Sequence, residues 1–484
     1  MNFSIIIFIL GNILKVEGIL LVCPLIISLI YKEGSKNIFS FLVVILILIL
    51  LGFLSTAKKP KKMGMQAKDG FIIVSLSWIL LSFFGALPFV ISGEIPSLVD
   101  AFFETSSGFT TTGSSILSSV EDLSHSMLFW RSFTHLIGGM GVLVFALAIL
   151  PAAGLESVHV MKAEVPGPVF GKLVAKMRIT ARILYGIYLV MTAVLIVLLM
   201  IGGMSLFDAS LHAFGAAGTG GFGIKNNSIA YYDSTYIHLV LGFAMLIFSV
   251  NFNLYYLVMI GEIKKIFESE ELKLFLTIVS ISIIVIFVNM GMTQGFSLIN
   301  LRDVFFQVSS IISTTGYSTV DYDKWPLFSK MVLLSIMFVG GCAGSTAGGL
   351  KVSRIGILLK TSFATLKKVV QPNRVLTIKF DQKTLDDNVI SSIVHYFVIY
   401  STVFVAILLI VSMDIDSFDT AFSAVVATFN NIGPGINGVG PVMNFGGFSD
   451  FTKIVLSLSM IFGRLEIYPM LILLGGFFKK LDLK

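Results

Sequence analysis

Four short turns of similar composition recur along the chain, and each has residue types that can replace the water around a monovalent cation. We call them turn 1 to turn 4: Thr111-Thr112-Gly113, Thr219-Gly220-Gly221, Thr314-Thr315-Gly316 and Asn431-Ile432-Gly433. A dehydrated cation needs rings of carbonyl oxygens, and glycine adopts the positive φ values that aim successive carbonyls at one axis. Threonine and asparagine can brace those carbonyls from behind. The four turns therefore predict one ion filter built by a single chain.

Each turn follows a short apolar run and precedes a long one. The short runs lie near residues 99–110, 207–217, 301–313 and 417–429. They are too short to cross a bilayer, so we expect re-entrant half-helices that enter the membrane and stop. The turns recur about every hundred residues, which leaves room in each repeat for two spanning helices besides the half-helix.

The rest of the chain has the composition of a membrane protein. Of its 484 residues, 56% are hydrophobic and only 13% are charged, and the mean hydropathy is +0.93, outside the range of soluble domains. Ten runs are long enough to span a bilayer, and they lie near residues 8–31, 38–57, 71–92, 127–151, 182–202, 236–260, 272–292, 329–350, 389–413 and 451–478.

This order predicts an all-α integral membrane protein. Four pseudo-repeats of helix, re-entrant pore half-helix and helix would surround one central pore. Residues 1–69 would hold an extra N-terminal helix pair and a basic cytoplasmic loop. The pore repeats would follow as residues 70–160, 161–263, 264–375 and 376–484.

Basic residues in short loops set the predicted orientation. Lys58, Lys59, Lys61, Lys62 and Lys68 mark the loop before the first repeat as cytoplasmic, and the loops between repeats are basic too. Both termini are then cytoplasmic and all four turns open outward. The net charge of +6 does not indicate nucleic-acid binding, because these loops account for it. Acidic residues that would attract a cation lie on the outer side: Glu94, Asp100, Glu104, Asp208, Asp303 and Asp419.

A glycine-rich segment interrupts the eighth long run, and we call Gly340–Gly349 the glycine loop. Its glycines should break the helix inside the membrane. Arg464 lies in the last run, where a charge is costly unless it faces a pore or a partner. We predict that both form a gate below the filter, although Arg464 could instead pair structurally with Glu466 or with carbonyl groups, and both roles can hold together. The gate glycines are Gly340, Gly341, Gly344, Gly348 and Gly349.

These segments resemble the membrane subunit of the Trk/Ktr potassium-uptake systems, specifically the TrkH type, over essentially the whole chain. The extra N-terminal pair favours the TrkH type over the shorter Ktr subunit. Turn 3, with Ser313 before it and Tyr317 after it, also looks like the TVGYG filter of potassium channels. The resemblance is carried by residues 107–114, 212–222, 313–317, 340–351 and 463–468.

The resemblance implies potassium uptake through a pseudo-fourfold, channel-like pore in a bacterial-type inner membrane. It also implies a homodimer, a glycine loop that blocks the pore, and a cytosolic nucleotide-binding ring subunit of the TrkA type. Potassium ions would bind at the filter residues, the nucleotide would bind the partner, and no organic cofactor is expected on this chain. Members with serine at the first filter glycine are associated with sodium, so Gly113 favours potassium. Turns 2 and 4 depart from Thr-Thr-Gly, so the filter is not expected to be truly fourfold.

A different transport class stays open at this point. A secondary carrier could move a small solute or another monovalent cation with sodium or protons through broken helices at the midplane. Such carriers often have inverted repeats, whereas the basic loops here separate repeats of one orientation, which disfavours that reading.

An enzyme is not expected. The six histidines are scattered, and Cys23 and Cys342 form no CxxC pair. The glycine loop has P-loop glycine spacing, but Leu350 stands where phosphate binding needs lysine. His212 remains a weak candidate for shaping the filter. The cytoplasmic segments 157–182 and 351–387 are docking candidates that could equally hold membrane lipid headgroups.

Overall fold

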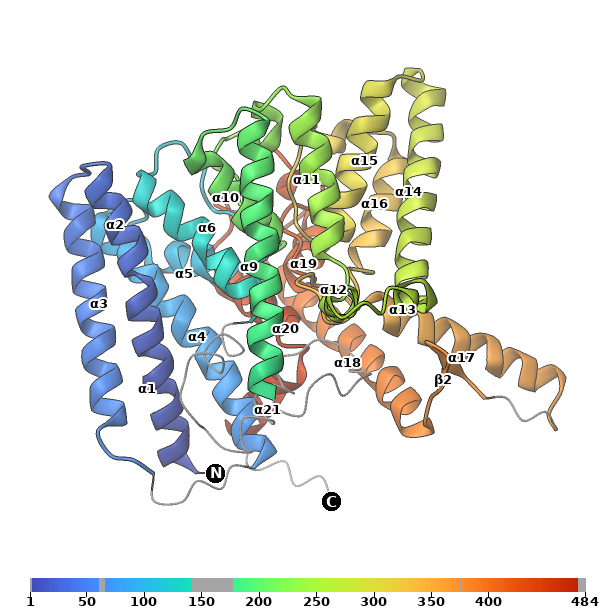
Figure 1. The fold of residues 1–484 in the computed structure, drawn as a ribbon, viewed down its shortest axis with the longest axis horizontal. Coiled ribbons are helices and arrows are strands. Elements are labelled where there is room, and N and C mark those ends of the chain that lie inside the picture. The colour runs from blue at the N-terminus through green and yellow to red at the C-terminus, as the bar shows by residue number, and fades with distance from the viewer. Residues whose placement is uncertain (1, 61–65, 142–176, 374–376, 478–484) are drawn as a thin grey trace.

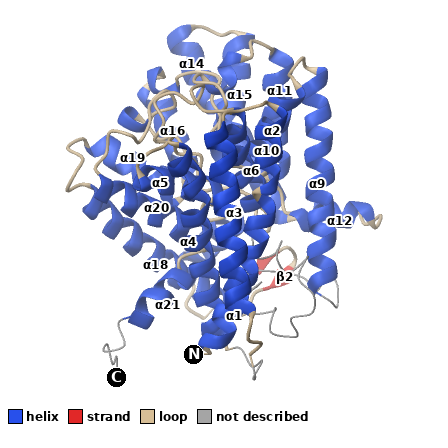
Figure 2. Ribbon diagram, turned by 90° about the vertical axis from the view of Figure 1, so that its left-hand side faces the viewer, coloured by secondary structure: helices blue, strands red, loops and turns tan. Residues whose placement is uncertain are grey.

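The computed structural model describes residues 2–60, 66–141, 177–373 and 377–477, and this part of the chain is mostly helical (Figures 1 and 2). The prediction of an all-α membrane protein is confirmed, with one small departure. β1 (Lys379–Phe380) and β2 (Lys383–Thr384) form a two-residue antiparallel hairpin in which Lys379 pairs with Thr384. Six described helices are long and apolar enough to span a membrane.

The N-terminal helices form one side of the molecule, drawn in blue in Figure 1. α1 (Phe3–Leu20) continues past Leu21 into α2 (Val22–Ile30), and α3 (Ser35–Thr56) returns alongside α1. Glycines allow the close approach, since a Cβ added to Gly52 would lie 2.8 Å from the Gly11 carbonyl oxygen. Small residues at such contacts are typical of helix packing in membranes.

The remaining helices follow one order four times. A long helix comes first: α4 (Ala67–Ser92), α9 (Met177–Ile201), α14 (Glu270–Gln294) and α18 (Asp387–Val411). A half-helix follows: α5 (Leu98–Phe109), α10 (Leu206–Ala217), α15 (Leu298–Ile312) and α19 (Phe418–Phe429). A second helix ends the unit: α6 (His125–Gly139), α11 (Thr235–Phe248), α16 (Leu327–Met337) and α20 (Asp450–Arg464).

Serine caps fix where the half-helices begin. Each half-helix is preceded by a serine whose side-chain oxygen accepts a hydrogen bond from the backbone N–H three residues later, which satisfies a donor that the helix leaves free. The four caps are Ser97, Ser205, Ser297 and Ser417. Short 3-10 helices lie in the connections after the turns: η1 (Ser228–Tyr231), η2 (Tyr322–Lys324) and η3 (Asn437–Val439).

The units interlock as a closed ring. The half-helix of each unit packs on the second helix of the unit before it, so that α10 contacts α6, α15 contacts α11 and α19 contacts α16. The ring closes because α5, from the first unit, packs on α20, from the last. Every half-helix is thereby held by its own unit and by the unit before it.

Three of the second helices are followed by a break within the described residues. α11 and α12 (Phe252–Met259) meet at 91°, α17 (Val352–Val370) continues beyond the glycine loop, and α21 (Tyr468–Phe477) follows α20 after a break at 465–467. The predictions of single spans over 236–260 and 451–478 are therefore wrong. Helix ends leave carbonyls unbonded, and the Ser249 carbonyl at the first break accepts the Cys342 N–H at 2.9 Å.

Some predicted features lie outside the described residues. These are the second half of the predicted span 127–151, most of the basic segment 157–182, and Lys61 and Lys62 of the first basic loop. In Figure 1, α13 (Lys264–Glu268) lies at the lower end of α14, which it precedes in the chain. α17 projects away from the bundle at the lower right.

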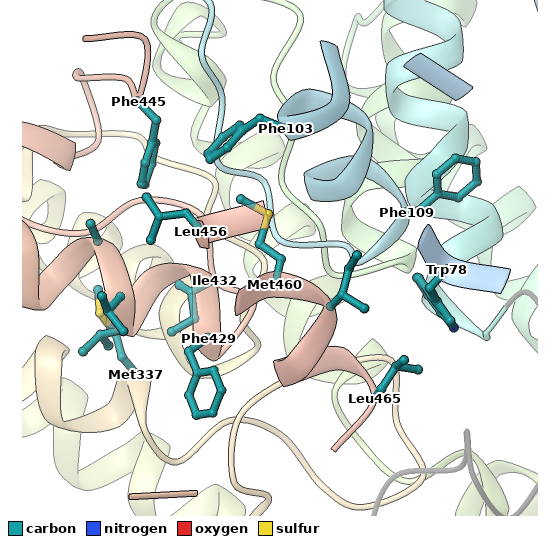
Figure 3. Packing of buried hydrophobic residues seen from close by; sticks show 14 of the residues in the cluster. Trp78, Phe103, Phe109, Met337, Phe429, Ile432, Phe445, Leu456, Met460 and Leu465 are labelled. Atoms are coloured by element: carbon teal, nitrogen blue, oxygen red, sulfur yellow. The ribbon is translucent and has the colours of Figure 1, made fainter. Parts of the chain in front are cut away.

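One apolar cluster packs among α9, α10 and α11, and a larger one extends mainly through the other three units (Figure 3). The larger cluster joins the first unit, through Trp78 and Phe103, to the last, through Phe429 and Leu456. Figure 3 shows Ile432 of turn 4 between Leu456 and Phe429. The turn is therefore anchored from behind by side chains of α19 and α20.

We expect Gly52→Ala to destabilise the N-terminal pair. The added methyl group would overlap backbone of α1, and overpacking of this kind typically costs about 1–3 kcal/mol. Gly186→Ala in α9 is the matched control, because nothing lies within 4 Å of its added Cβ. Thermal unfolding in detergent should show a lower midpoint for the Gly52 variant alone; equal midpoints would contradict the close contact.

Candidate functional site

The four turns share one backbone conformation. The first residue of each turn is left-handed: φ is 55° at Thr111, 54° at Thr219, 57° at Thr314 and 55° at Asn431. Three of these residues are threonines, and a left-handed β-branched residue is strained; such strain persists mainly where the surroundings enforce it for a functional reason. The final glycine is left-handed as well, with φ from 73° at Gly221 to 102° at Gly433.

Each turn is tied to its own half-helix in the same way. The N–H of the middle residue donates to the carbonyl five residues earlier, at 2.8–2.9 Å. This 6→1 bond closes the C-terminus of a helix that ends in a left-handed residue. The four bonds run from Thr112 to Ser107, Gly220 to Gly215, Thr315 to Ser310 and Ile432 to Ala427.

The turns meet in a closed ring. The final glycine of each turn lies against the carbonyl oxygen of the middle residue of the next turn, and the last turn meets the first. A side chain at any of these glycines would collide with that oxygen. The distance from the added Cβ to the oxygen is 2.1 Å from Gly113 to the Gly220 oxygen and 1.8 Å from Gly221 to the Thr315 oxygen. It is 2.1 Å from Gly316 to the Ile432 oxygen and 2.8 Å from Gly433 to the Thr112 oxygen.

All four final glycines border one cavity of about 130 Å³. Gly113, Gly221, Gly316 and Gly433 contribute to its wall, together with residues that follow the turns such as Ser114. Since a water molecule occupies roughly 30 Å³ in the liquid, this volume accommodates a small cation with part of its hydration shell.

Half-helix dipoles favour a cation at this place. A single residue separates the end of each half-helix from its turn, so its C-terminus is directed toward the ring. A helix C-terminus carries a partial negative charge of about half an elementary charge. Four such ends converge, and they stabilise a cation without an anionic side chain.

Side-chain hydrogen bonds brace three of the turns. Thr110 and Thr112 hydroxyls are 2.7 Å apart in turn 1, and Ser313 and Thr315 hydroxyls are 2.7 Å apart beside turn 3. In turn 4, the Asn431 amide donates to the Thr112 hydroxyl and to the Met460 carbonyl, each at 2.9 Å. These bonds explain the choice of threonine and asparagine. Ile432 needs no such bond, because its side chain packs in the apolar core (Figure 3).

Three of the six outer carboxylates named in the sequence analysis form ion pairs with basic side chains. Asp100 pairs with Lys453 at 2.6 Å, Asp303 with Arg302 at 2.9 Å, and Glu104 with Arg131 at 2.5 Å. A paired carboxylate contributes little field at a distance. These three acids therefore contribute less to the attraction of a cation than unpaired carboxylates would.

The Glu104–Arg131 pair joins turn 1 to turn 2. The two side chains are only 1% and 3% exposed. Glu104 accepts the Ile116 N–H at 3.0 Å after turn 1, and Arg131 donates to the Gly223 carbonyl at 2.8 Å after turn 2. Both segments leaving the turns are held by one buried ion pair.

The glycine loop lies directly against the turns. The Gly348 N–H donates to the Thr314 hydroxyl at 2.7 Å, and a Cβ on Gly348 would lie 2.3 Å from the Asn430 carbonyl oxygen. Gly340 and Gly349 pack on each other with φ of 71° and 75°, and Gly344 is also left-handed with φ of 73°. Gly341 packs between Ala347 and the break at Ser249, where a Cβ would lie 3.0 Å from the Ser249 carbonyl oxygen.

Arg464 connects the glycine loop to α6. Its guanidinium donates to the Thr346 carbonyl at 2.9 Å and to the Gly139 carbonyl at 2.7 Å. The anticipated carbonyl pairing is therefore present. Glu466 instead binds Arg354, with Oε2 to Nη2 at 2.6 Å.

His212 lies behind turn 3 rather than in the ring. Its carbonyl accepts the Tyr317 hydroxyl at 3.1 Å, and its Nε2 lies 3.2 Å from the Tyr232 hydroxyl. Both cysteines are free thiols, and among the described residues no cluster of histidine, cysteine or acidic side chains could hold a metal ion.

Comparison with known proteins places these features in a family. The family model for TrkH, a cation transport protein, matches residues 34–476. The chain belongs to the TrkH family. It is 36% identical to the Trk system potassium uptake protein TrkH of Escherichia coli K12, with 98% of each chain covered, and 35% identical to TrkG of the same strain, with 94% of each covered.

A solved TrkH structure has the same fold. The potassium transporter TrkH from Vibrio parahaemolyticus superposes with a TM-score of 0.88 at 34% identity, covering 99% of this chain and all of that one. The resemblance to the TrkH type is thus confirmed. Arg131 is the residue of this TrkH chain that the sequence analysis missed. A charge inside the apolar run 127–151 is the same signal that singled out Arg464.

We expect Glu104→Gln to destabilise this TrkH chain strongly. Breaking a buried ion pair leaves an uncompensated charge and typically costs about 3–5 kcal/mol. Glu262→Gln is the control, because its pair with Lys265 is 43% and 57% exposed, and exposed pairs contribute about 0–1 kcal/mol. Chemical unfolding monitored by tryptophan fluorescence gives the two values, and similar losses for both variants would contradict the assigned role of the pair.

Proposed function

We propose that this chain mediates potassium uptake through a selective pore, with the ring of four turns as its filter. The ion passes Thr111–Gly113, Thr219–Gly221, Thr314–Gly316 and Asn431–Gly433. It then passes the glycine loop and Arg464. No covalent chemistry is involved, and the potassium ion is the transported substrate.

The closed ring is the observation that carries this proposal. Four carbonyl oxygens from equivalent residues meet at equivalent glycines, and carbonyl rings are what a potassium filter requires. A ring made of main chain also suits potassium better than a divalent ion, which prefers carboxylates. The names of the relatives, which are potassium uptake proteins, agree.

We propose further that the glycine loop and Arg464 form the gate. The loop contacts turn 3 at Thr314, and its Gly348 lies against Asn430 and against Asn431 of turn 4. Arg464 fixes the loop to α6 through hydrogen bonds to carbonyls. Its positive charge raises the barrier for a cation until the loop and the arginine move together.

We also propose the partners and the placement that the resemblance to the TrkH type implies. The chain functions as a homodimer in a bacterial-type inner membrane, with both termini cytoplasmic. A TrkA-type nucleotide-binding ring subunit opens the gate by contact with 157–182 and 351–387. α17 supports this contact, because it leads from the glycine loop and exposes Leu359, Phe363 and Leu366 beyond the bundle (Figure 1).

Replacing Gly113 by Ser tests the filter. The added side chain would meet the Gly220 carbonyl at 2.1 Å, so the ring must distort, and we expect the potassium-to-sodium flux ratio to fall by about tenfold, equivalent to about 1.4 kcal/mol. Gly203→Ser is the matched control: Gly203 is left-handed with φ of 96°, but its Cβ would meet nothing within 4 Å.

The assay combines growth of potassium-uptake-deficient cells with flux into reconstituted vesicles, with the cytosolic partner supplied. Selective flux that relaxes with Gly113→Ser and persists with Gly203→Ser agrees with the proposal. Robust flux whose ion ratio ignores Gly113 contradicts it, and favours a carrier with its site elsewhere.

Thr314→Val tests the gate. Valine keeps the shape of threonine but removes the acceptor for the Gly348 N–H. A buried donor without a partner costs about 1–3 kcal/mol, which favours states in which the loop has left. We expect higher basal potassium flux without the partner subunit. Thr314→Ser keeps the hydroxyl, so this variant should stay closed. Equal basal flux in the unsubstituted chain, the Val variant and the Ser variant argues against the gate.

A further inference from the structure

Turn 2 lacks the hydroxyl brace that turns 1 and 3 possess. In those turns the residues before and after the left-handed threonine carry hydroxyls in hydrogen-bond contact. The equivalent residues of turn 2 are Gly218 and Gly220, which have no side chains. The Gly220 and Gly221 N–H groups bond to the Gly215 carbonyl, so what is missing is side-chain support for the Gly220 carbonyl, which faces Gly113 in the ring.

His135 occupies the space where those side chains would be. A Cβ on Gly220 would lie 2.4 Å from Cγ and Nδ1 of the His135 ring, and a Cβ on Gly218 would lie 2.2 Å from the His135 carbonyl oxygen. The His135 side chain is fully buried. Glycine is therefore required at both positions of turn 2 because α6 brings this histidine against it.

The same face of α6 holds the residue that follows turn 2. The His135 ring stacks on Phe222 with centroids 4.3 Å apart and planes at 23°. Arg131, one helical turn earlier, lies 3.5 Å from the centre of the Phe222 ring and donates to the Gly223 carbonyl. Residues at i and i+4 share a helix face, so α6 holds turn 2 and its exit segment as one unit.

Contact between His135 and turn 2 is steric. Both ring nitrogens of His135 are buried without a hydrogen-bond partner in the structure. Unlike a threonine hydroxyl, the imidazole positions the peptide by filling volume between α6 and the turn. Close-packed interiors transmit such volume changes to their neighbours.

We infer that His135 is the positioning residue of turn 2 and determines how well the pore discriminates potassium from sodium. It touches no ion. Its imidazole sets the position of the Gly220 carbonyl. A smaller side chain lets that carbonyl move away from the ring of four turns. The inference rests on the proposed function, because it assumes that the ring is the filter.

A double-mutant cycle on His135 and Gly220 tests the inference. His135→Ala should lower the potassium-to-sodium flux ratio by about tenfold, equivalent to about 1.4 kcal/mol. Gly220→Ala introduces a clash with the His135 imidazole and should lower the potassium-to-sodium flux ratio or the yield of folded protein. In the double variant the methyl group enters the space that His135 vacates, so both properties should recover, and the two effects should be strongly non-additive.

His238→Ala is the matched control. His238 is also buried, but it packs near Phe306, and no filter glycine meets it. Its substitution should leave the flux ratio unchanged. A general effect of removing a buried histidine would lower the ratio in both alanine variants and would overturn the inference.

Gly113→Ser in the same assay separates the two ways to fail. If Gly113→Ser leaves the ratio unchanged, the filter proposal itself fails. If Gly113→Ser relaxes the ratio while His135→Ala does not, the filter stands and the role of His135 is wrong. Additive effects in the cycle would also overturn it. Should Gly220→Ala fail to fold, the His135→Ala ratio decides the question, with thermal unfolding showing that this variant is intact.

Discussion

The close approach of four glycines to four carbonyl oxygens is the constraint on which the rest of the structure depends. Each carbonyl oxygen lies too close to the facing glycine for a side chain to fit between them. The turns therefore need glycine as their final residue and a left-handed backbone at their first. Such strained turns persist only when held from several sides. The ring of half-helices, each packed on the second helix of the preceding unit, provides that support.

Breaks in the second helices serve the same arrangement. Continuous helices would use all their own carbonyls, whereas the breaks expose several to other segments. The ends of α11 and α6 offer theirs to the glycine loop and to Arg464. The proposed gate is thus built on main-chain groups that the fold leaves free, and it lies against the turns that it would close.

Composition and repetition in the sequence predicted the turns, the half-helices and the glycine loop, because each depends on local residue types. The break at Ser249 could not be predicted, since no proline and no glycine run marks it and the glycine loop that uses its carbonyl is distant in sequence. The break at 465–467 has local signals that the sequence analysis did not use, Gly463 before it and Pro469 just after it. The Arg354–Glu466 pair joins residues 112 positions apart. The dependence of Gly220 on His135 likewise needs the packing of α6 on α10.

Ion binding at the ring is the most direct test of this account. Crystals grown with thallium(I) or rubidium in place of potassium, measured at the absorption edge of the ion, locate the bound cation by anomalous scattering. The account predicts a peak on the axis surrounded by the carbonyls of Thr112, Gly220, Thr315 and Ile432. A ring without a peak, in crystals that bind the ion elsewhere along the chain, would contradict it.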